Sequence, residues 1–365
     1  MAQILLNMIV KNEGEIITRL LESVTDIIDA LVICDTGSTD QTIAIIENWA
    51  SSKNIPHRVV KDSWVNFGTN RTNAIFHAKE FIIENGNLLK NWYLLFLDAD
   101  MQLKIDSSFF KSPLNYPAYN IKQFTAGGLE YYNARLVRAD VEMKYVCPTH
   151  EYLETKGIAS TILDSLQIFD IGDGGAKTDK YERDIKLLTE ALEQEPGNPR
   201  YLFYLANSYF DIGNYTAAKQ YYQARYEANG WSEERWFAKY KWGLCLLNLD
   251  AIKDAEDILL QAFEERPWRA EPIYQLALFY HKKNDHARAY MYASLALKLN
   301  DTKDDILFID SYGNGNGPVE IISVHAYYLL FFEEGQKCTE KLIADYPGVE
   351  RHEQNLQYYK NINQI

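Results

Sequence analysis

The sequence has few cysteines, no excess of basic residues and no long apolar run. Its four cysteines, Cys34, Cys147, Cys245 and Cys338, are far apart and form no Cys-x-x-Cys pair. This spacing argues against a zinc site or a disulfide framework, and it favours reduced thiols in a cytoplasmic protein.

The sequence also lacks a positive net charge and a long apolar stretch, and each of these absences argues against one class of binding partner. The formal net charge of −14 argues against a nucleic-acid-binding protein, because neutralising phosphates requires a basic face. No stretch reaches the roughly 20 apolar residues of a membrane-spanning helix. Residues 1–10 are apolar but short, lack a basic segment and are interrupted by Asn7, so we interpret them as a first strand and not as a signal peptide. We therefore expect a cytoplasmic protein with no membrane span.

The composition is that of a globular protein, and the length of 365 residues predicts two domains. Up to about residue 170, short apolar segments alternate with stretches of helical periodicity, which predicts a parallel sheet with right-handed crossover helices. After Asp98 two strands follow without a helix between them, so we expect the sheet to become mixed. The expected strands are 4–10, 31–34, 59–60, 93–97, 119–124 and 129–137, and the expected helices are 15–24, 39–49 and 69–84. We expect Ser38 and Gln41 to form a capping box at the start of the second helix.

From about residue 179 onward the pattern is helical and contains an internal repeat. Small residues recur at two positions in each unit, a pattern that lets the two helices of a hairpin approach closely. They are Ala206, Gly243 and Ala277 at the first position and Ala218, Ala255 and Ala289 at the second. The spacing resembles the tetratricopeptide repeat, with a looser unit at 319–346 and a generic helical bundle as the alternative. The glycines at 172–175 are the expected linker, which predicts domains at 1–175 and 176–365.

Asp98-Ala99-Asp100 follows the apolar strand 94–97. Because side chains alternate along an extended chain, both carboxylates emerge on the same side of the strand end. Two carboxylates so close repel one another unless a cation intervenes, and Mg²⁺ or Mn²⁺ satisfies them while keeping positions open for phosphate oxygens. We predict a Mn²⁺ or Mg²⁺ site that stabilises a departing diphosphate. The alternative is a pair of solvated surface acids.

Asp35 ends the second expected strand and precedes a turn into a helix. A strand–turn–helix connection explains Gly37 and Ser38, but it does not explain a carboxylate at that position, which has no obvious partner in the sequence. Ligands bind such sheets beyond the carboxyl ends of the strands. There Asp35 can accept hydrogen bonds from a uracil or a ribose.

Four ordered motifs resemble those of family 2 glycosyltransferases. They are Met8–Glu13, Asp35–Asp40, Phe67–Asn73 and Leu97–Asp100. The resemblance implies a GT-A fold, which is the Rossmann-like mixed α/β sheet of nucleotide-diphospho-sugar transferases, together with inversion at the anomeric carbon, a UDP-sugar donor and Mn²⁺ or Mg²⁺. A GT-A domain joined to tetratricopeptide repeats also resembles a bacterial and viral subgroup that includes peptide S-glycosyltransferases.

The resemblance implies roles for individual residues. Asp100 would be the main metal ligand, with Asp98 at the ribose or the metal and Asp35 at the base. Arg71 would reach the nucleotide side of the cleft, and a solvated helix residue paired with a carboxylate is the alternative. The implied nucleotide-sugar contacts are Val10, Asn12, Glu13, Asp35, Arg71 and Asp98.

Thr149-His150-Glu151 lies beside Cys147-Pro148, where the chain has to turn. An inverting transfer needs a base that deprotonates the acceptor hydroxyl, and Glu151 is the candidate, although related enzymes often use an acid pair that this chain does not present in an obvious place. Neutral imidazole suits Mn²⁺, so His150 is a candidate metal ligand beside Asp98 and Asp100. The two roles can be exchanged, and a buried structural histidine beside a surface glutamate is the alternative.

Three cations, Lys177, Lys180 and Arg183, follow the glycines of the expected linker. A flexible loop that contains them can fold over a diphosphate and exclude water. The alternative is a linker followed by the solvated start of a helix.

Together these features predict a metal-dependent inverting glycosyltransferase that moves a sugar from a nucleotide sugar, with UDP-sugar expected, to a glycan, protein or lipid-linked acceptor. A non-catalytic helical-repeat scaffold with a vestigial nucleotide-sugar-binding domain is the alternative, and the presence of Asp35, Arg71, Asp98 and Asp100 argues against it. A nucleotidyltransferase would require a basic, glycine-rich N-terminal stretch, whereas residues 11–14 offer a single lysine. We expect the repeats to bind a peptide or protein partner or to self-associate.

Overall fold

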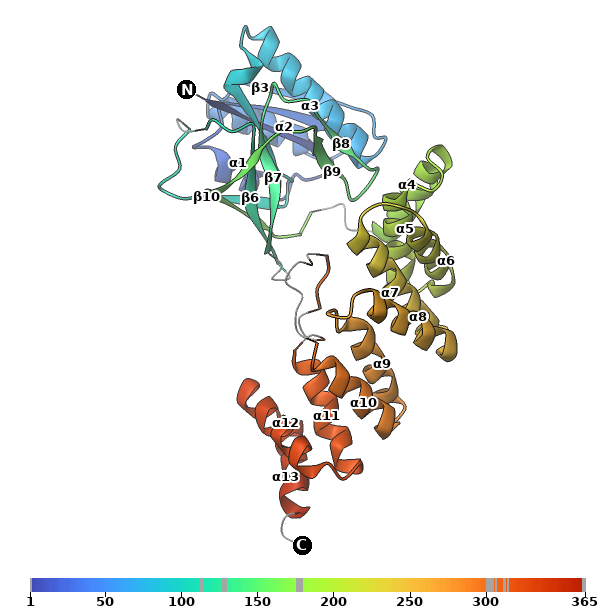
Figure 1. The fold of residues 1–365 in the computed structure, drawn as a ribbon. Coiled ribbons are helices and arrows are strands. Elements are labelled where there is room, and N and C mark those ends of the chain that lie inside the picture. Colours follow the sequence, from blue (N-terminus) through green and yellow to red (C-terminus); the bar gives the residue numbers. More distant parts are fainter. Residues whose placement is uncertain are drawn as a thin grey trace. The chain divides into compact units, whose positions relative to one another are not determined.

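The computed structural model describes residues 2–111, 114–126, 130–174, 180–299, 305, 307–310, 313 and 315–362. The chain divides into two compact units, Met1–Leu187 and Leu188–Ile365. The first is a mixed sheet with helices on both faces, and the second is all-helical (Figure 1). This architecture confirms the predicted fold class. The predicted boundary between residues 175 and 176 lies outside the described residues.

In the described part of the N-terminal unit, the main sheet has the strand order β3-β2-β1-β4-β7-β6-β10-β5. Strands β1 to β4 run parallel, β7 is antiparallel to both β4 and β6, and β10 is parallel to β6. The carboxyl ends of β1, β2, β4 and β10 therefore lie at the same edge of the sheet. The strands are β1 (Gln3–Val10), β2 (Ala30–Asp35), β3 (His57–Lys61), β4 (Trp92–Phe96), β5 (Met101–Ile105), β6 (Ala118–Thr125), β7 (Glu130–Arg138) and β10 (Ser160–Asp170).

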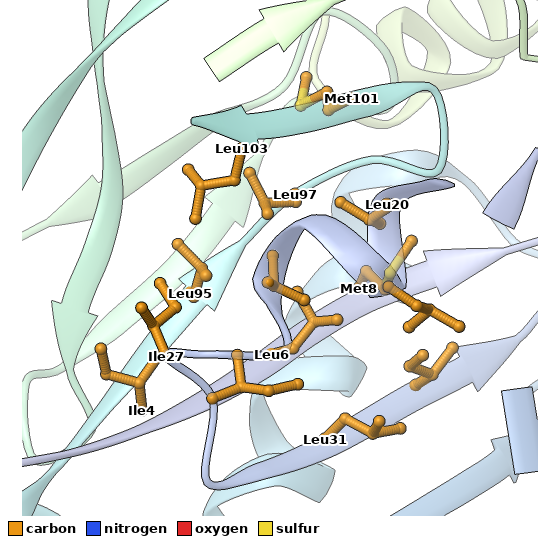
Figure 2. Close-up of a cluster of buried hydrophobic side chains, with 14 of the residues drawn as sticks. Ile4, Leu6, Met8, Leu20, Ile27, Leu31, Leu95, Leu97, Met101 and Leu103 are labelled. Carbon is orange, nitrogen blue, oxygen red and sulfur yellow. The ribbon is translucent and has the colours of Figure 1, made fainter. Parts of the chain in front are cut away.

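Hydrophobic layers cover both faces of this sheet. Leu6 and Met8 of β1 pack with Leu95 of β4 and Leu20 of α1 (Figure 2), and residues of α2 belong to the same layer. Leu5 packs on the opposite face with α3. Ligands bind sheets of this kind beyond the carboxyl ends of the strands. The helices of this unit are α1 (Ile17–Val24), α2 (Thr42–Ser52), α3 (Phe67–Glu84) and the 3-10 helix η1 (Leu89–Asn91), and a separate hairpin of β8 (Met143–Val146) and β9 (Tyr152–Thr155) packs on α3.

The second helix begins later than the sequence pattern predicts. It starts at Thr42, and its N-terminus has no capping box. The Asp40 carboxylate accepts a hydrogen bond from the Thr42 N–H at 3.0 Å, while the Ser38 hydroxyl accepts one from the Asn12 N–H at 2.9 Å. The predicted capping box of Ser38 and Gln41 is therefore wrong, because Ser38 binds the loop that follows β1.

The C-terminal unit is a series of helices in which, from α5 onward, each packs against the next (Figure 1). None of the described helices is long and apolar enough to cross a membrane. The helices are α4 (Lys180–Gln194), which continues from the first unit, α5 (Pro199–Asp211), α6 (Tyr215–Glu227), α7 (Ser232–Asn248), α8 (Ile252–Glu265), α9 (Glu271–Lys282), α10 (His286–Ala296), α11 (Asn316–Tyr328), α12 (Phe332–Asp345) and α13 (Glu350–Ile362).

The small residues of the predicted repeat lie where paired helices meet. Ala206 and Ala218 are fully buried in α5 and α6, which pack together. A Cβ at Gly243 of α7 would lie 2.6 Å from the side chain of Leu259 of α8, so a larger residue does not fit. Residues 319–346 form most of α11 and α12. The repeat prediction is confirmed.

Three histidines of this unit form a chain across α9, α10 and α11. His325 Nε2 lies 2.7 Å from His281 Nδ1, and His325 Nδ1 lies 2.8 Å from His286 Nδ1. Burial, together with His281 and His286, lowers the pKa of His325 to about 4, although Asp285 acts in the opposite direction. His325 is therefore neutral at pH 7 in the folded unit.

We expect this chain of histidines to make the C-terminal unit sensitive to acid. The unfolded chain takes up a proton at His325 near pH 6.5, whereas the folded chain does not until about pH 4, so the free energy of unfolding falls between these values. Calorimetry measures how far the melting temperature drops between pH 7.5 and pH 5. This drop should be at least about 2 °C smaller in His325→Gln than in the unchanged chain. His77→Gln, a half-buried histidine of α3, is the control. An equal drop in all three proteins would exclude His325 as the source.

Candidate functional site

A cleft of about 510 Å³ lies at the carboxyl edge of the sheet. Its volume is in the range of small-molecule and cofactor sites. The lining residues all belong to the N-terminal unit. They come from the ends of β1 and β10, from the segments that follow β1, β2, β3, β4 and β10, and from the starts of β5, α3 and α4. They are Ile9, Val10, Lys11, Asn12, Glu13, Thr36, Trp64, Phe67, Arg71, Asp98, Ala99, Asp100, Met101, Asp170, Gly174 and Arg183.

The structure brings most of the predicted site residues to this cleft. The predicted residues in its lining are Val10, Asn12, Glu13, Arg71, Asp98, Asp100 and Arg183. The predicted residues outside its lining are Asp35, His150, Glu151 and Lys180. Of these four, Glu151 is connected to the cleft through Arg71.

The loops after β1 and β2 hold one another in place. Asn12 has a left-handed backbone, with φ of 55°, and its side-chain oxygen accepts a hydrogen bond from the Thr39 N–H at 2.8 Å. The Glu13 N–H donates to the Thr42 hydroxyl, also at 2.8 Å. Asn12 and Glu13 therefore fix the shape of this end of the cleft as well as lining it.

Asp35 has partners that the sequence did not reveal. Its buried carboxylate accepts hydrogen bonds from the N–H groups of Gly37 at 3.2 Å and Ser38 at 3.1 Å. Gly37 has φ of 113°, a conformation that favours glycine. The prediction that the turn leaves Asp35 without a partner is therefore wrong, because the carboxylate closes its own turn. Its contact with a base stays a prediction.

Arg71 is the centre of a charged network on the wall of the cleft. Its guanidinium, on α3, lies 2.5 Å from Asp98 Oδ1 and 2.7 Å from Glu151 Oε1. Arg135 of β7 lies 3.7 Å from Asp98 Oδ2. Because the Arg71 side chain is only 12% exposed, this residue is not a solvated helix position.

The network keeps its members charged. Burial raises the pKa of the Asp98 carboxyl, but Arg71 and Arg135 outweigh burial and hold that pKa below its ordinary value. Burial also opposes the charge of Arg71, and Asp98 and Glu151 outweigh burial and raise the pKa of the guanidinium. Tyr145, whose ring centre lies 5.6 Å from the Arg71 guanidinium carbon, has its pKa raised by burial to about 12. Asp98 is thus an anion held by two arginines.

The turn between β8 and β9 presents Glu151 to Arg71. In it, Cys147 and His150 have positive φ values of 80° and 51°, which few residues other than glycine adopt. A Cβ at Gly68 of α3 would lie 2.2 Å from the Cys147 carbonyl oxygen. Only glycine at position 68 lets α3 approach the turn so closely.

His150 contacts α4 and does not join Asp98 and Asp100. Its Nε2 lies 3.5 Å from Oδ2 of the buried Asp184, and the Thr149 hydroxyl donates to Asp184 Oδ1 at 2.9 Å. Burial raises the pKa of the Asp184 carboxyl, but His150 and Thr149 outweigh burial and lower it. Within the described residues there is no group of three or more His, Cys, Asp or Glu side chains suited to a metal. The predicted metal set of Asp98, Asp100 and His150 is therefore not assembled.

The start of α4 places one predicted cation at the cleft. Arg183 lines the cleft, with its guanidinium carbon 5.0 Å from the ring centre of Phe67. The Lys180 ammonium lies 5.7 Å from the ring centre of Tyr181 and outside the lining. Lys177 lies outside the described residues.

Two further carboxylates of the cleft, Asp100 and Asp170, belong to linked segments of the chain. Both line the cleft, and the chain beside Asp170 is tied to Asp100 by a hydrogen bond of 3.1 Å from the Ile171 N–H to the Asp100 carbonyl. A Cβ at Gly174 would lie 3.1 Å from Asp100 Oδ2, so glycine at this position leaves room beside the carboxylate. Carboxylate oxygens are the ligands that Mg²⁺ and Mn²⁺ prefer, and these ions keep further positions for water and phosphate.

Sequence reasoning missed Asp170, Arg135 and the aromatic wall of the cleft. Asp170 follows apolar residues at the end of β10 just as Asp98 follows β4, so a signal was present. Trp64 and Phe67 lie edge to face with ring centres 4.8 Å apart. Both line the cleft and provide an apolar surface against which a base or sugar ring can pack.

Family comparisons agree with this architecture. Residues 7–108 match the family model described as "Glycosyl transferase family 2", and residues 177–262 match "Anaphase-promoting complex, cyclosome, subunit 3", a model of tetratricopeptide-like repeats. The N-terminal unit thus matches family 2 glycosyltransferases over residues 7–108 and the following helices match tetratricopeptide-like repeats, which confirms the resemblance found in the sequence motifs.

Individual relatives are similar over part of their length. A TPR repeat-containing protein of Synechococcus elongatus is 30% identical over 167 residues, which cover 44% of this chain and 37% of that protein. The chain therefore spans little more than a third of this relative. Among solved structures, MamA is 18% identical over 54% of this chain and 98% of its own, with a TM-score of 0.37. The C-terminal part of a TPR repeat-containing protein from Cytophaga hutchinsonii is 12% identical over 50% and 66%, with a TM-score of 0.42.

Proposed function

We propose that the protein is a metal-dependent inverting glycosyltransferase that binds a nucleotide sugar, with UDP-sugar as the donor, in the cleft at the carboxyl edge of the sheet. The observation that supports this most strongly is the arrangement of the two strand-end aspartates. Asp98 pairs with Arg71 and Arg135, and Asp100 lines the same cleft close to Gly174, as part of a lining that also includes Asp170. The match of residues 7–108 to a glycosyltransferase family includes both aspartates.

The nucleoside is proposed to bind at the end of the cleft formed by the loops after β1 and β2. Val10, Asn12 and Glu13 line this end, and the hydrogen bonds between the loops fix its shape before a ligand arrives. Such preorganisation lowers the entropic cost of binding. The Asp35 carboxylate adjoins this end through its turn and is proposed to accept a hydrogen bond from the base.

Asp100 and Asp170 are proposed to hold Mn²⁺ or Mg²⁺ in place of the set Asp98, Asp100 and His150. A bound divalent ion would offset the charge that develops on the diphosphate as the sugar leaves. Asp98 then supports the wall through Arg71, and Arg183 adds a positive charge at the start of α4. Together with Lys180, Arg183 is proposed to help cover the diphosphate and exclude water.

Glu151 is proposed to act as the general base, and its carboxylate is positioned by Arg71 at 2.7 Å. Glu151→Gln keeps a side-chain oxygen for Arg71 but cannot accept the proton of an acceptor hydroxyl. Turnover should therefore fall by about 100- to 10,000-fold with little change in UDP affinity, as steady-state kinetics and calorimetry would show. An unchanged rate would mean that Glu151 only positions Arg71.

Calorimetry with UDP tests the proposal as a whole. UDP should bind the chain, and Mn²⁺ should strengthen this binding by about tenfold or more, which corresponds to about 1.4 kcal/mol. A panel of sugar nucleotides, compared by thermal stabilisation with Mn²⁺, would then identify the donor. Absence of UDP binding with Mn²⁺ present would favour the alternative of a helical-repeat scaffold with a vestigial domain.

A further inference from the structure

One buried amide lies among apolar side chains near the carboxyl edge of the sheet. Because side chains alternate along a strand, Tyr119, Ile121 and Gln123 of β6 point to the same face. The first two belong to the apolar layer on that face, and so does Ile168 of β10, which lies opposite Gln123. Gln123 itself is only 1% exposed. An apolar residue would continue this layer, whereas burying an amide costs free energy unless it is hydrogen-bonded.

The two ends of the Gln123 amide contact charges of opposite sign. Its oxygen accepts a hydrogen bond from the Arg135 guanidinium at 3.0 Å, and its nitrogen donates to Asp170 Oδ2 at 3.3 Å. In the opposite orientation the NH₂ group would face the guanidinium and the oxygen would face the carboxylate, and both contacts would be repulsive. Arg135 therefore fixes the orientation of the amide, and the amide holds Oδ2 of Asp170 toward β6.

A β-bulge brings Arg135 to this position. In the pairing of β6 with β7, Ala134 lies opposite Asn120 and Leu136 lies opposite Tyr119, so Arg135 is an extra residue. Bulges redirect a side chain and are common beside active sites. The Arg135 side chain is 11% exposed, and its Nε–H is buried without an acceptor among the described residues. Because an unsatisfied buried donor costs free energy, packing of the sheet alone does not explain an arginine here.

The amide and the bulge together connect two aspartates of the cleft. The Arg135 guanidinium lies 3.7 Å from Asp98 Oδ2, so the connected residues are, in order, Asp98, Arg135, Gln123 and Asp170. They belong to the neighbouring strands β4, β7, β6 and β10, with Asp98 directly beyond the end of its strand. The two aspartates line the cleft, but Gln123 and Arg135 do not. Any effect of Gln123 on a ligand therefore passes through a neighbouring residue.

We propose that Gln123, oriented by Arg135, is a positioning residue that holds the Asp170 carboxylate in the orientation in which it binds a divalent cation. This inference rests on the proposed function, in which Asp100 and Asp170 hold Mn²⁺ or Mg²⁺. The hydrogen-bonding partners of a metal-binding carboxylate orient it, and the loss of such a partner typically lowers metal affinity by about 10- to 100-fold.

Gln123→Met tests the proposal, because methionine has nearly the same length and shape but makes neither hydrogen bond. Electron paramagnetic resonance measures Mn²⁺ binding without any nucleotide, and the affinity should fall by about 10- to 100-fold. Calorimetry should show that UDP binding in the absence of metal is unaltered, since Gln123 does not line the cleft. If metal-free UDP binding weakened as much as Mn²⁺ binding, Gln123 would support the whole cleft and would not position Asp170.

Asn120→Leu is the matched control on the same strand. The Asn120 side chain donates to the Ser160 hydroxyl of β10 at 3.1 Å, so this substitution also removes an amide that links β6 to β10, but outside the lining of the cleft. It should leave Mn²⁺ affinity unaltered. An equal loss of affinity in Asn120→Leu and Gln123→Met would assign the effect to a general weakening of the sheet and would overturn the proposal.

A double variant establishes whether Gln123 acts through Asp170. In a chain that already contains Asp170→Asn, Gln123→Met should lower Mn²⁺ affinity no further, because effects that pass through one shared residue are not additive. A further loss as large as in the unchanged chain would contradict the proposal.

A shorter amide keeps the test decisive if Gln123→Met does not fold, which circular dichroism establishes. Gln123→Asn keeps an acceptor for Arg135 but is one methylene too short to reach both partners, so Mn²⁺ affinity should again fall. If the unchanged chain bound Mn²⁺ and the folded variants bound it equally well, only the role of Gln123 would be lost. If the unchanged chain bound no Mn²⁺, the proposed metal-dependent function would fail together with this inference.

Discussion

Asp100→Asn should lower donor hydrolysis and sugar transfer by about 1,000-fold or more, while the chain stays folded. Metal stabilisation of the leaving diphosphate is worth several kcal/mol, and each 1.36 kcal/mol corresponds to a factor of ten in rate. The substitution keeps the shape of the side chain and replaces a charged oxygen ligand by a neutral amide. Calorimetry should show that Mn²⁺ no longer strengthens UDP binding, because the proposed ion loses its main protein ligand.

Asp164→Asn is the matched control for this variant. Asp164 lies on β10, in the same unit, but is exposed and outside the lining of the cleft. The same change of charge should leave Mn²⁺-dependent UDP binding and turnover unaltered. If Asp100→Asn and Asp164→Asn behaved alike, the metal would have to be placed elsewhere, and the proposed role of Asp170 would be lost with that of Asp100.

The positions of the strand-end residues could be predicted from the sequence. Val10, Asp35 and Asp98 each follow an apolar segment, and the rule that parallel strands end at one edge brings them together. β1, β2 and β4 are adjacent and parallel, so the prediction needed only the local pattern and the order of the elements. The same reasoning would have found Asp170 if residues 160–170 had been interpreted as a strand.

The partners of these residues could not be predicted, because they depend on distant segments. Glu151 reaches Arg71 only because the turn between β8 and β9 packs against α3, where Gly68 permits a close approach. Likewise His150 belongs to Asp184, a residue in a different helix. Periodicity identifies the face of an element, but it does not specify which charged side chains pair across 30 or more residues of sequence.

The partners seen in the structure change the interpretation of the Asp98-Ala99-Asp100 motif. From the sequence, two neighbouring carboxylates require one cation between them. In the structure, Asp98 has two guanidinium groups near it, so its charge is already offset by the protein. We therefore propose separate tasks for the two aspartates: Asp98 organises the wall of the cleft, and Asp100 binds the metal ion.

Arg71→Met should destabilise the N-terminal unit by about 3 kcal/mol and abolish UDP binding. Removing one partner of a buried ion pair leaves an uncompensated charge, which costs about 3–5 kcal/mol, and the lower end applies because Asp98 is partly exposed. Chemical denaturation followed by fluorescence measures the change in the free energy of unfolding. Arg58→Met is the control, since Arg58 forms an exposed pair with Glu84 in the same unit and should cost less than about 1 kcal/mol.

A double variant separates the structural role of Arg71 from its role in binding. Adding Glu151→Gln to Arg71→Met removes the unpaired carboxylate, so part of the lost stability should return. UDP binding should not return, because the positive charge on the nucleotide side of the cleft is still missing. If the double variant recovered both stability and UDP affinity, Arg71 would act only by holding the wall together. If the double variant recovered neither stability nor UDP affinity, the carboxylate that depends on Arg71 would be Asp98. Once Arg71 is replaced, Arg135 at 3.7 Å is the remaining guanidinium partner of Asp98 among the described residues.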